Sequence, residues 1–434
     1  MKNKIYSIVV MYFITVFIWS FNTITSFGYI PVLDEENYDE KRVVKEQIKR
    51  TKTYEGVITD SKGNVICSPD TVGEAGFVHS PAYYSLIGSY ASGGLRNRYS
   101  EELWDADKNH KGKPIKLTTN STIQEFSYRQ LKNLGVTGSV VVMENTTGRI
   151  LALASSNSEY ELDINNATKE AMEKAQSIDG YFVPRWNVYH APGSVYKAVT
   201  SVAIIENNLE DEIYNDLGEY IINKNHIVHN YGNARYGDVT LSNGLKNSIN
   251  TYFAFMGYKL GPESLREVSE RFMVGSTIDL DFATIHSSNG IDGTISNVVS
   301  TSFGQGKLLL SPVNIAMIVN AIANDGKMMK PYIIDSIDGK TYSEDDVLTK
   351  VCKKSTARKL KKYLMDTGIH YGIPEEMGIG CKTGTAEIGN NLNRAVFMAF
   401  NEKYTVVLTA DDTNLFGESL RYNVVEIFKK LENI

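Results

Sequence analysis

Three short segments of the chain combine residue types that can perform acyl transfer. In the first, APGSVYK, Ser194 precedes Lys197 by three positions, and Pro192 and Gly193 interrupt the chain just before an apolar run. This pattern predicts a helix that begins near Ser194, with both side chains on one face. A serine hydroxyl is a poor nucleophile unless a base takes its proton, and a neutral Lys197 could be that base. A capping serine followed by a surface lysine is the alternative.

A lysine is neutral near pH 7 only if its ordinary pKa of about 10.4 is lowered. Burial and neighbouring cations both lower the pKa of a lysine. Such surroundings could therefore bring the pKa of Lys197 close enough to 7 for it to act as a base.

The second segment, SINTYFAFM, begins at Ser248 and runs directly into aromatic and apolar residues. A polar pair that opens onto an apolar helix can be held rigidly over a cleft. In that position Ser248 could relay a proton and Asn250 could hold a substrate amide. An ordinary helix cap is the alternative interpretation.

The third segment is KTGTAE, which begins at Lys382. On an edge strand, a glycine such as Gly384 lets the backbone of a ligand approach closely. Lys382 would supply positive charge for a substrate carboxylate, and the hydroxyls of Thr383 and Thr385 would donate hydrogen bonds. A strand with a bulge at Gly384 is the alternative.

The elements around these segments predict an α+β domain over residues 135–434. A strand, a turn and a second strand are expected over residues 138–156, and three strands with a closing helix near the carboxyl end. Helices between them suggest an antiparallel sheet flanked by helices, with a helical subdomain. The expected helices cover residues 196–206, 241–258, 311–323 and 419–431. Residues 28–134 read as a smaller, strand-containing module with a turn at Asp60 to Asn64.

The amino-terminal segment indicates a membrane anchor. Residues 5–21 are uncharged and mostly apolar, and Lys2 and Lys4 precede them. This run reaches the lower limit for a helix that spans a bilayer. The lysines predict a cytoplasmic tail of residues 1–4, a single-pass anchor and an exported body. A cleaved signal peptide is the alternative, but an Ala-x-Ala cleavage site is missing from the region that follows.

Composition excludes several other classes of function. The formal net charge is −6 and the chain carries no long basic run beyond its first residues, which argues against nucleic acid as a partner. Three cysteines, Cys67, Cys352 and Cys381, are too few for a disulfide scaffold and form no C-x-x-C pair. We read His226 and His229 as part of a polar surface hairpin and expect neither a metal nor a cofactor.

Taken together and in this order, the three segments match the motif set of the penicillin-binding proteins and class A β-lactamases. The sequence resembles the class B penicillin-binding proteins, the monofunctional peptidoglycan D,D-transpeptidases. The resemblance extends to the Gly-Gln-Gly segment and following helix over residues 302–331, to TGRILALAS, and to GVITDSKGNVI. One departure is that Glu55 stands where the family usually has a basic residue, and Ser61 and the segment LTTNSTIQ also differ. These departures leave the junction between the two modules open.

The resemblance implies a role for each motif residue. Ser194 would be acylated, Lys197 would be its general base, and Ser248 would carry the proton to the leaving D-alanine. Asn250 would hold the donor peptide and Lys382 would polarise the site.

The same resemblance implies that Thr383, Gly384 and Thr385 bind substrate. The backbone N–H groups of Ser194 and Thr385 would form the oxyanion hole. The substrates would be stem peptides with a D-Ala-D-Ala donor and an amine acceptor, and β-lactams would acylate the same serine. Polymerisation would require a membrane glycosyltransferase partner.

Two other functions remain open at this point. A class D-like β-lactamase or a D,D-carboxypeptidase would transfer the acyl group to water. A penicillin-binding sensor or silent scaffold would perform no chemistry, although a silent scaffold should have lost motif residues and this chain retains all of them.

Overall fold

The computed structural model describes residues 52–90, 93–178, 180–224, 226–389 and 392–434. Residues 53–434 form one compact unit. Within the described residues, the helices are too short or too polar to cross a bilayer. The predicted anchor, residues 5–21, and the predicted tail, residues 1–4, lie outside the described residues.

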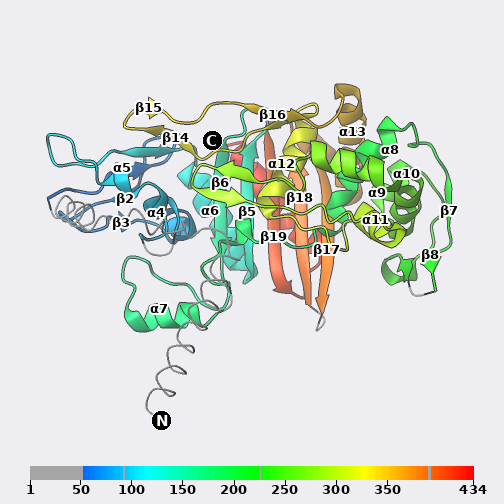
Figure 1. The fold of residues 1–434 in the computed structure, drawn as a ribbon, viewed down its shortest axis with the longest axis horizontal. Helices are drawn as coiled ribbons and strands as arrows, with labels where there is room; N and C mark the ends of the chain where they lie inside the picture. Colours follow the sequence, from blue (N-terminus) through cyan, green and yellow to red (C-terminus); the bar gives the residue numbers. More distant parts are fainter. Residues whose placement is uncertain (1–51, 91–92, 179, 225, 390–391) are drawn as a thin grey trace, which may run out of the picture. The chain divides into compact units, whose positions relative to one another are not determined.

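The centre of this unit is a five-stranded antiparallel sheet with the order β17-β18-β19-β5-β6 (Figure 1). It confirms both the predicted hairpin and the three predicted carboxy-terminal strands. Its strands are β5 (Thr137–Glu144), β6 (Ile150–Ser156), β17 (Gly380–Gly389), β18 (Leu392–Phe400) and β19 (Tyr404–Thr413). Because β17 stands at one end of the order, its outer edge is not covered by another strand of this sheet.

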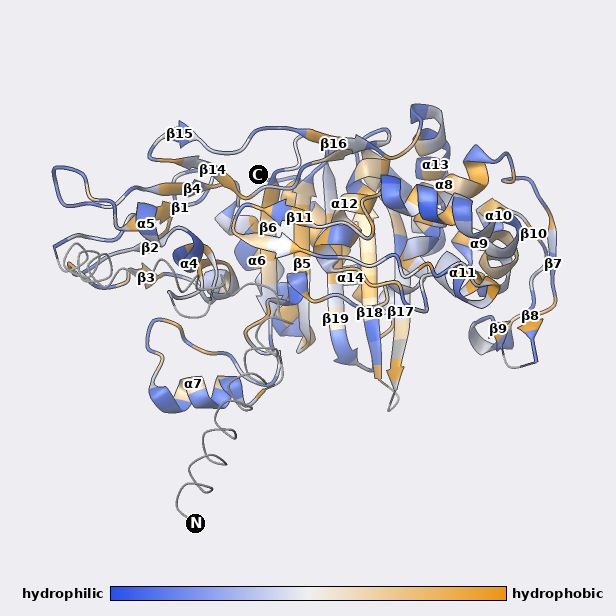
Figure 2. Ribbon diagram, in the orientation of Figure 1, coloured by the Kyte–Doolittle hydropathy of each residue, from blue (hydrophilic) through white to orange (hydrophobic). Residues whose placement is uncertain are grey.

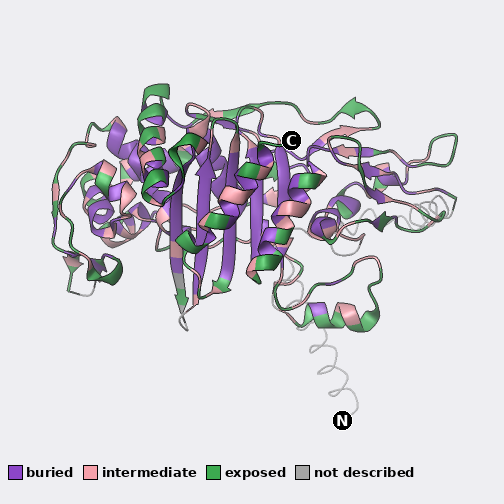
Figure 3. Cartoon of the chain, turned by 180° about the vertical axis from the view of Figure 1, so that it is seen from behind, coloured by how far each residue is buried: buried purple, intermediate pink, exposed green. Residues whose placement is uncertain are grey.

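Apolar residues cover both faces of this sheet, and its strands are buried along most of their length (Figures 2 and 3). One face packs against α6 (Ser121–Leu134) and α14 (Arg421–Leu431). The opposite face packs against α12 (Pro312–Ala323), within the same core cluster as α8 (Lys197–Glu206). A sheet buried on both faces is held rigidly, and its edge strand can therefore position a ligand.

The helices between the two groups of strands follow the sequence pattern with one correction. The helix predicted over residues 196–206 is α8, and the helix predicted over 311–323 is α12, where Ser311 caps the first turn and Pro312 begins it. The single helix predicted over residues 241–258 is wrong, because the chain forms α9 (Leu241–Lys246) and α10 (Asn250–Arg271). Ser248 separates them with a left-handed φ of +55°.

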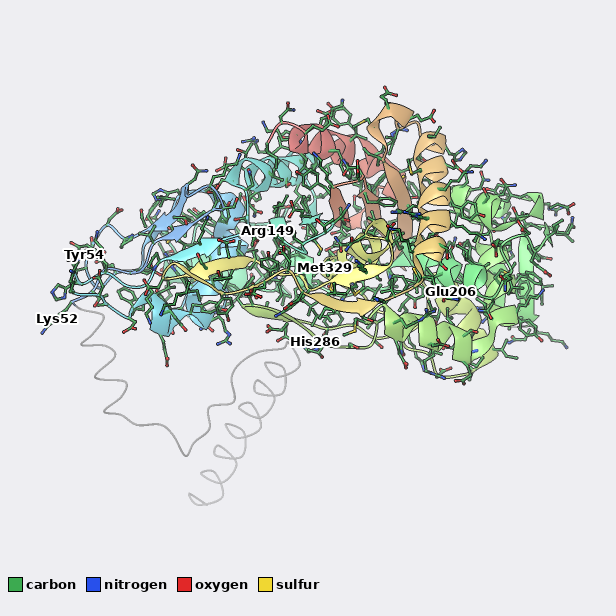
Figure 4. All side chains as sticks on the ribbon, turned by 90° about the horizontal axis from the view of Figure 1, so that it is seen from above. Lys52, Tyr54, Arg149, Glu206, His286 and Met329 are labelled. Carbon is green, nitrogen blue, oxygen red and sulfur yellow. The ribbon has the colours of Figure 1, made fainter. Side chains whose placement is uncertain are left out.

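A six-stranded sheet with the order β15-β14-β4-β1-β2-β3 is built from two distant parts of the chain. It confirms strands on both sides of the Asp60–Asn64 turn, and it also includes a hairpin from the segment after α12. Its strands are β1 (Ile58–Thr59), β2 (Val65–Ser68), β3 (Phe77–Val78), β4 (Ile115–Leu117), β14 (Ile334–Ile337) and β15 (Lys340–Thr341). Arg149, labelled in Figure 4, lies in the turn between β5 and β6. Its guanidinium pairs with Asp335 of β14 at 3.0 Å.

Glu55, the acidic residue at a position that is usually basic in the resembled family, belongs to a buried ion pair. Its carboxylate accepts hydrogen bonds from the Arg96 guanidinium, with an Nε to Oε1 distance of 3.0 Å, and both side chains are almost fully buried. The backbone N–H of Gly76 and the hydroxyl of Tyr90 also donate to Glu55. The carboxylate is therefore fully hydrogen-bonded in the interior of the protein.

Two-stranded sheets and further helices complete the described part of the fold. Helix α6 lies before the expected domain boundary at residue 135, yet it packs on β5 and β6 of the central sheet. The predicted division into residues 28–134 and 135–434 stays a prediction. Four two-stranded sheets are β7 (Tyr214–Asp216) with β10 (Gly237–Val239), β8 (Glu219–Asn223) with β9 (His226–His229), β11 (Ile278–Leu280) with β12 (Ala283–Ile285), and β13 (Lys327–Met329) with β16 (Val347–Lys350). The other α-helices of the described residues are α3 (Tyr84–Ile87), α4 (Leu95–Arg98), α5 (Ser100–Leu103), α7 (Lys169–Gln176), α11 (Ile295–Ser302) and α13 (Lys354–His370).

Candidate active site

Ser194 lies in a 3₁₀ turn, η4 (Gly193–Tyr196), that leads directly into α8. It is partly exposed, whereas Val195 and Tyr196 beside it are buried. The Gly-Gln-Gly segment, which begins at Gly304, is hydrogen-bonded to this turn. The N–H of Gly193 donates to the carbonyl of Gly304 at 3.0 Å. A Cβ on Gly304 would lie only 1.8 Å from the Gly193 carbonyl oxygen, so only glycine permits this approach. The predicted helix start at Ser194 is confirmed.

The side chain of Lys197 joins the first motif to the second. It is fully buried, and its Nζ donates to the carbonyl of Ser248 at 2.7 Å and to Oδ1 of Asn250 at 2.7 Å. A third contact of 3.2 Å reaches Oγ of Ser248. The Phe253 ring, with its centroid 5.4 Å from Nζ, adds an apolar wall.

Ser248 can present both its carbonyl and its hydroxyl to Lys197 because of its backbone conformation. Its φ of +55° ends α9, and its N–H donates to the carbonyl of Leu245 at 3.1 Å. A left-handed conformation costs a non-glycine residue about 1–2 kcal/mol. Such strain is often found at functional sites, where the surrounding contacts impose it.

Lys382 brings the third motif to the same hydroxyl. It is fully buried on β17, and its Nζ donates to Oγ of Ser248 at 2.9 Å and to the carbonyl of Thr383 at 3.0 Å. Oγ of Ser248 therefore lies within hydrogen-bond distance of two lysine side chains, Lys197 and Lys382. The three segments, far apart in the sequence, converge at Ser248.

Strand β17 runs beside the turn that carries Ser194. A Cβ on Gly384 would lie 2.8 Å from the carbonyl oxygen of Pro192, and a Cβ on Gly193 would lie 3.4 Å from the backbone nitrogen of Thr385. The two backbone segments whose N–H groups were predicted to form an oxyanion hole are thus neighbours. Ser194 also lies at the amino end of α8, where the helix dipole favours negative charge.

The hydroxyls of the two threonines have defined partners. Oγ1 of Thr383 is 2.9 Å from the hydroxyl of Tyr371, and Oγ1 of Thr385 accepts a hydrogen bond from the N–H of Gly417 at 3.1 Å. Beside Gly417, the ring of Phe416 meets that of Tyr231 with centroids 5.9 Å apart. The loop after β19 and the loop after β9 therefore touch close to this strand.

Comparison with known proteins gives this site a family. Residues 138–431 match the penicillin binding protein transpeptidase domain. The chain belongs to this family. The predicted resemblance to the class B penicillin-binding proteins is thereby confirmed.

Two relatives show how far the likeness extends. PbpA of Mycolicibacterium smegmatis, a peptidoglycan D,D-transpeptidase, is 24% identical over 380 residues, which cover 76% of each chain. Penicillin-binding protein 3 of Bacillus subtilis is 25% identical, and the match covers 70% of this chain but only 50% of that relative. The ceftriaxone acyl-enzyme complex of penicillin-binding protein A from M. tuberculosis superposes with a TM-score of 0.80 at 21% identity, covering 88% of this chain and 99% of that one. This last likeness shows that the fold is shared.

Burial of the two lysines in the transpeptidase domain sets their protonation. Desolvation lowers the pKa of Lys382 to about 7. Desolvation, followed by repulsion from Lys382, lowers the pKa of Lys197 well below its ordinary value. Since Lys197 is affected by both causes, it is the better candidate for a neutral amine at pH 7. Burial and a neighbouring cationic group, the two causes that can lower the pKa of a lysine, are both present at Lys197.

Two residues that the sequence motifs did not identify also contact this machinery. Tyr371, at the end of α13, bonds Thr383, and Asp216, on β7, bonds Thr251 at 2.6 Å beside Asn250. Neither belongs to a motif, and neither lies near its partner in the sequence. The predicted surface hairpin with His226 and His229 is formed by β8 and β9. Among the described residues, no group of three or more His, Cys, Asp or Glu could hold a metal ion.

Proposed function

We propose that the chain is a peptidoglycan D,D-transpeptidase that forms an acyl-enzyme at Ser194. The observation that supports this most strongly is the convergence of Lys197, Ser248, Asn250 and Lys382 in one hydrogen-bonded group, one helical turn from Ser194. The names of relatives such as PbpA agree with this function. The proposed reaction consists of two acyl transfers, and neither of them requires a metal or a cofactor.

In the first step, Oγ of Ser194 attacks the carbonyl carbon between the two terminal D-alanines of a stem peptide. Neutral Lys197 takes the hydroxyl proton. The N–H groups of Ser194 and Thr385 stabilise the developing oxyanion, and removal of one such donor commonly costs about 10²–10³ in rate. The C–N bond then breaks, and the leaving D-alanine amine receives the proton through the hydroxyl of Ser248.

In the second step, the amine of a neighbouring stem peptide attacks the acyl-enzyme. Ser248 and Lys197 accept the proton that this amine loses, and a proton returns to Oγ of Ser194 as the ester bond breaks. The atoms balance, since one amide is broken and one is formed. Deacylation by water would instead give a D,D-carboxypeptidase or a β-lactamase.

Substrate binding is assigned to β17 and Asn250. Lys382, with the hydroxyls of Thr383 and Thr385, would bind the terminal carboxylate of the donor peptide. The backbone at Gly384 would lie along the extended peptide, and the N–H group of Asn250 that does not bond His229 would hold a peptide carbonyl. β-Lactams would occupy the same positions and acylate Ser194.

The amino-terminal part would place this chemistry at the membrane. We assign residues 5–21 to a single-pass anchor, residues 1–4 to the cytoplasm, and residues 28–134 to a pedestal that carries the transpeptidase domain of residues 135–434 outside the cell membrane. A membrane glycosyltransferase would supply the glycan strands. Susceptibility of the folded body to external protease in spheroplasts would test this orientation, and complete protection would contradict it.

Covalent labelling tests the proposed nucleophile. The full-length protein and a Ser194→Ala variant are incubated with a fluorescent penicillin, and the adduct is located by mass spectrometry. We expect a long-lived adduct on Ser194 that the variant lacks. No adduct on folded wild-type protein would contradict the proposal.

The acceptor is tested separately with a thioester analogue of the stem peptide. Incubation with and without a D-amino acid amine should give mainly the new amide when the amine is present. Products of hydrolysis alone, or an adduct that disappears within seconds, would favour the hydrolase.

A further inference from the structure

Asp216, the last residue of β7, carries a buried carboxylate. It is 1% exposed, and each of its two oxygens accepts two hydrogen bonds. Oδ1 accepts from the N–H of Gly218 at 3.1 Å and from the hydroxyl of Thr251 at 2.6 Å. Oδ2 accepts from Nδ2 of Asn230 and from the N–H of Tyr236, both at 2.9 Å. Four donors therefore fill this carboxylate, and they come from the turn after β7, the loop after β9 and the first turn of α10.

These contacts lead directly to the amide of Asn250. Oδ1 of Asn230, held by Asp216, accepts from the N–H of Thr251 at 3.1 Å. The carbonyl of His229, immediately before Asn230, accepts from Nδ2 of Asn250 at 3.1 Å. This bond determines which way the Asn250 amide faces, since its Oδ1 then points to Nζ of Lys197.

We propose that Asp216 is a positioning residue for acyl transfer, which holds the segment of residues 229–230 against the start of α10 and so fixes the orientation of the Asn250 amide. This role rests on the proposed function. With Asp216 in place, Asn250 offers an oxygen to Lys197 and keeps one N–H for the substrate. If the segment moves away, the Asn250 amide loses the acceptor that orients it.

The chemistry of the four partners explains why a carboxylate occupies this position. All four are donors, and a carboxylate has acceptor capacity on both oxygens. An asparagine of the same shape would turn an NH₂ group toward two of these donors and leave them buried without acceptors. Asp216→Asn is therefore a small change in volume with a large effect on the segment.

Asp281 offers a matched control. It is also a buried carboxylate, 6% exposed, and it accepts from the backbone N–H groups of Ile333 and Ile334 at 2.7 and 2.9 Å and from the hydroxyl of Ser343 at 3.0 Å. These partners lie in the segment around β14 and include none of the motif residues. Asp281→Asn should lower stability without changing the chemistry of the folded protein.

The experiment measures the second-order rate constant for acylation of full-length protein by a fluorescent penicillin, corrected for the folded fraction. We expect Asp216→Asn to slow acylation by about 10–100-fold, the size of effect that small misplacements of reacting groups produce. Thr251→Val should slow it in the same direction and Thr251→Ser should restore it, while Asp281→Asn should acylate like wild type. Thr251→Val serves as the independent test where Asp216→Asn folds poorly.

A double-mutant cycle separates positioning from general destabilisation. If Asp216 acts through Asn250, Asp216→Asn should cause no further loss in an Asn250→Ala background. An equal loss in both backgrounds, or a wild-type rate for folded Asp216→Asn, would overturn the role of Asp216. Wild-type protein that gives no Ser194 adduct would overturn the proposed function itself and this role with it.

Discussion

Replacing Lys382 with methionine should change how the stability of the protein depends on pH. Lys382 is fully buried, and burial lowers its pKa from 10.5 to about 7. Between these two values the unfolded chain keeps the proton while the folded chain releases it. The unfolded state then binds more protons, so the free energy of unfolding of the wild type rises with pH in this window. Methionine has a similar length and no proton to release.

The size of this effect follows from the difference in bound protons. Each pH unit contributes about 1.4 kcal/mol for one full proton. From pH 7 to pH 9, the folded Lys382 goes from half protonated to almost fully neutral while the unfolded lysine remains charged. The wild type should therefore gain about 2 kcal/mol of stability that the variant lacks. Loss of Lys382 also relieves the repulsion on Lys197, which acts in the same direction.

Urea unfolding of wild type and Lys382→Met at both pH values measures this difference. Changes in packing and in the hydrogen bond to Ser248 are common to both pH values and cancel, as do the titrating groups other than Lys197, whose contribution has the same sign as that of Lys382. The advantage of the variant over the wild type should fall by about 2 kcal/mol from pH 7 to pH 9. Parallel behaviour of the two proteins would refute the lowered pKa of Lys382.

Three further substitutions test other contacts. Glu55→Gln should lower the free energy of unfolding in urea by about 3–5 kcal/mol because it leaves a buried charge on Arg96. The double exchange Glu55→Arg with Arg96→Glu should recover part of that loss. A loss below about 1 kcal/mol, typical of a surface ion pair, would contradict the buried pair. Gly304→Ala would place a Cβ 1.8 Å from the carbonyl oxygen of Gly193, so penicillin acylation should slow by about 10²-fold, and an unchanged rate would show that the turn tolerates the shift. Tyr371→Phe removes the hydroxyl that is hydrogen-bonded to Thr383. The penicillin concentration for half-maximal acylation should then rise roughly fivefold, as expected for the loss of about 1 kcal/mol. No rise would mean that this hydrogen bond does not orient Thr383.

The sequence alone determined the local features, because these depend on residues close together in the chain. Pro192 and Gly193 before an apolar run predicted the helix start at Ser194, and the apolar strand segments separated by turns at both ends of the domain predicted the central sheet. The order of the three motifs predicted the family. For the helix start and the strands, hydrophobic pattern and turn chemistry act over a few residues, so that they can be read directly from the sequence. The family was predicted by resemblance to a known set of motifs.

Only the tertiary structure decided how the motifs act on one another. The left-handed Ser248 that divides one predicted helix into two, the fully buried pair of Lys197 and Lys382, and the contact of Asp216 with the start of α10 all join segments distant in sequence. A pKa reflects desolvation and neighbouring charge, and both are properties of the packed interior. The sequence could indicate which lysine should act as a base, but only the fold provides the burial and the neighbouring charge that lower its pKa.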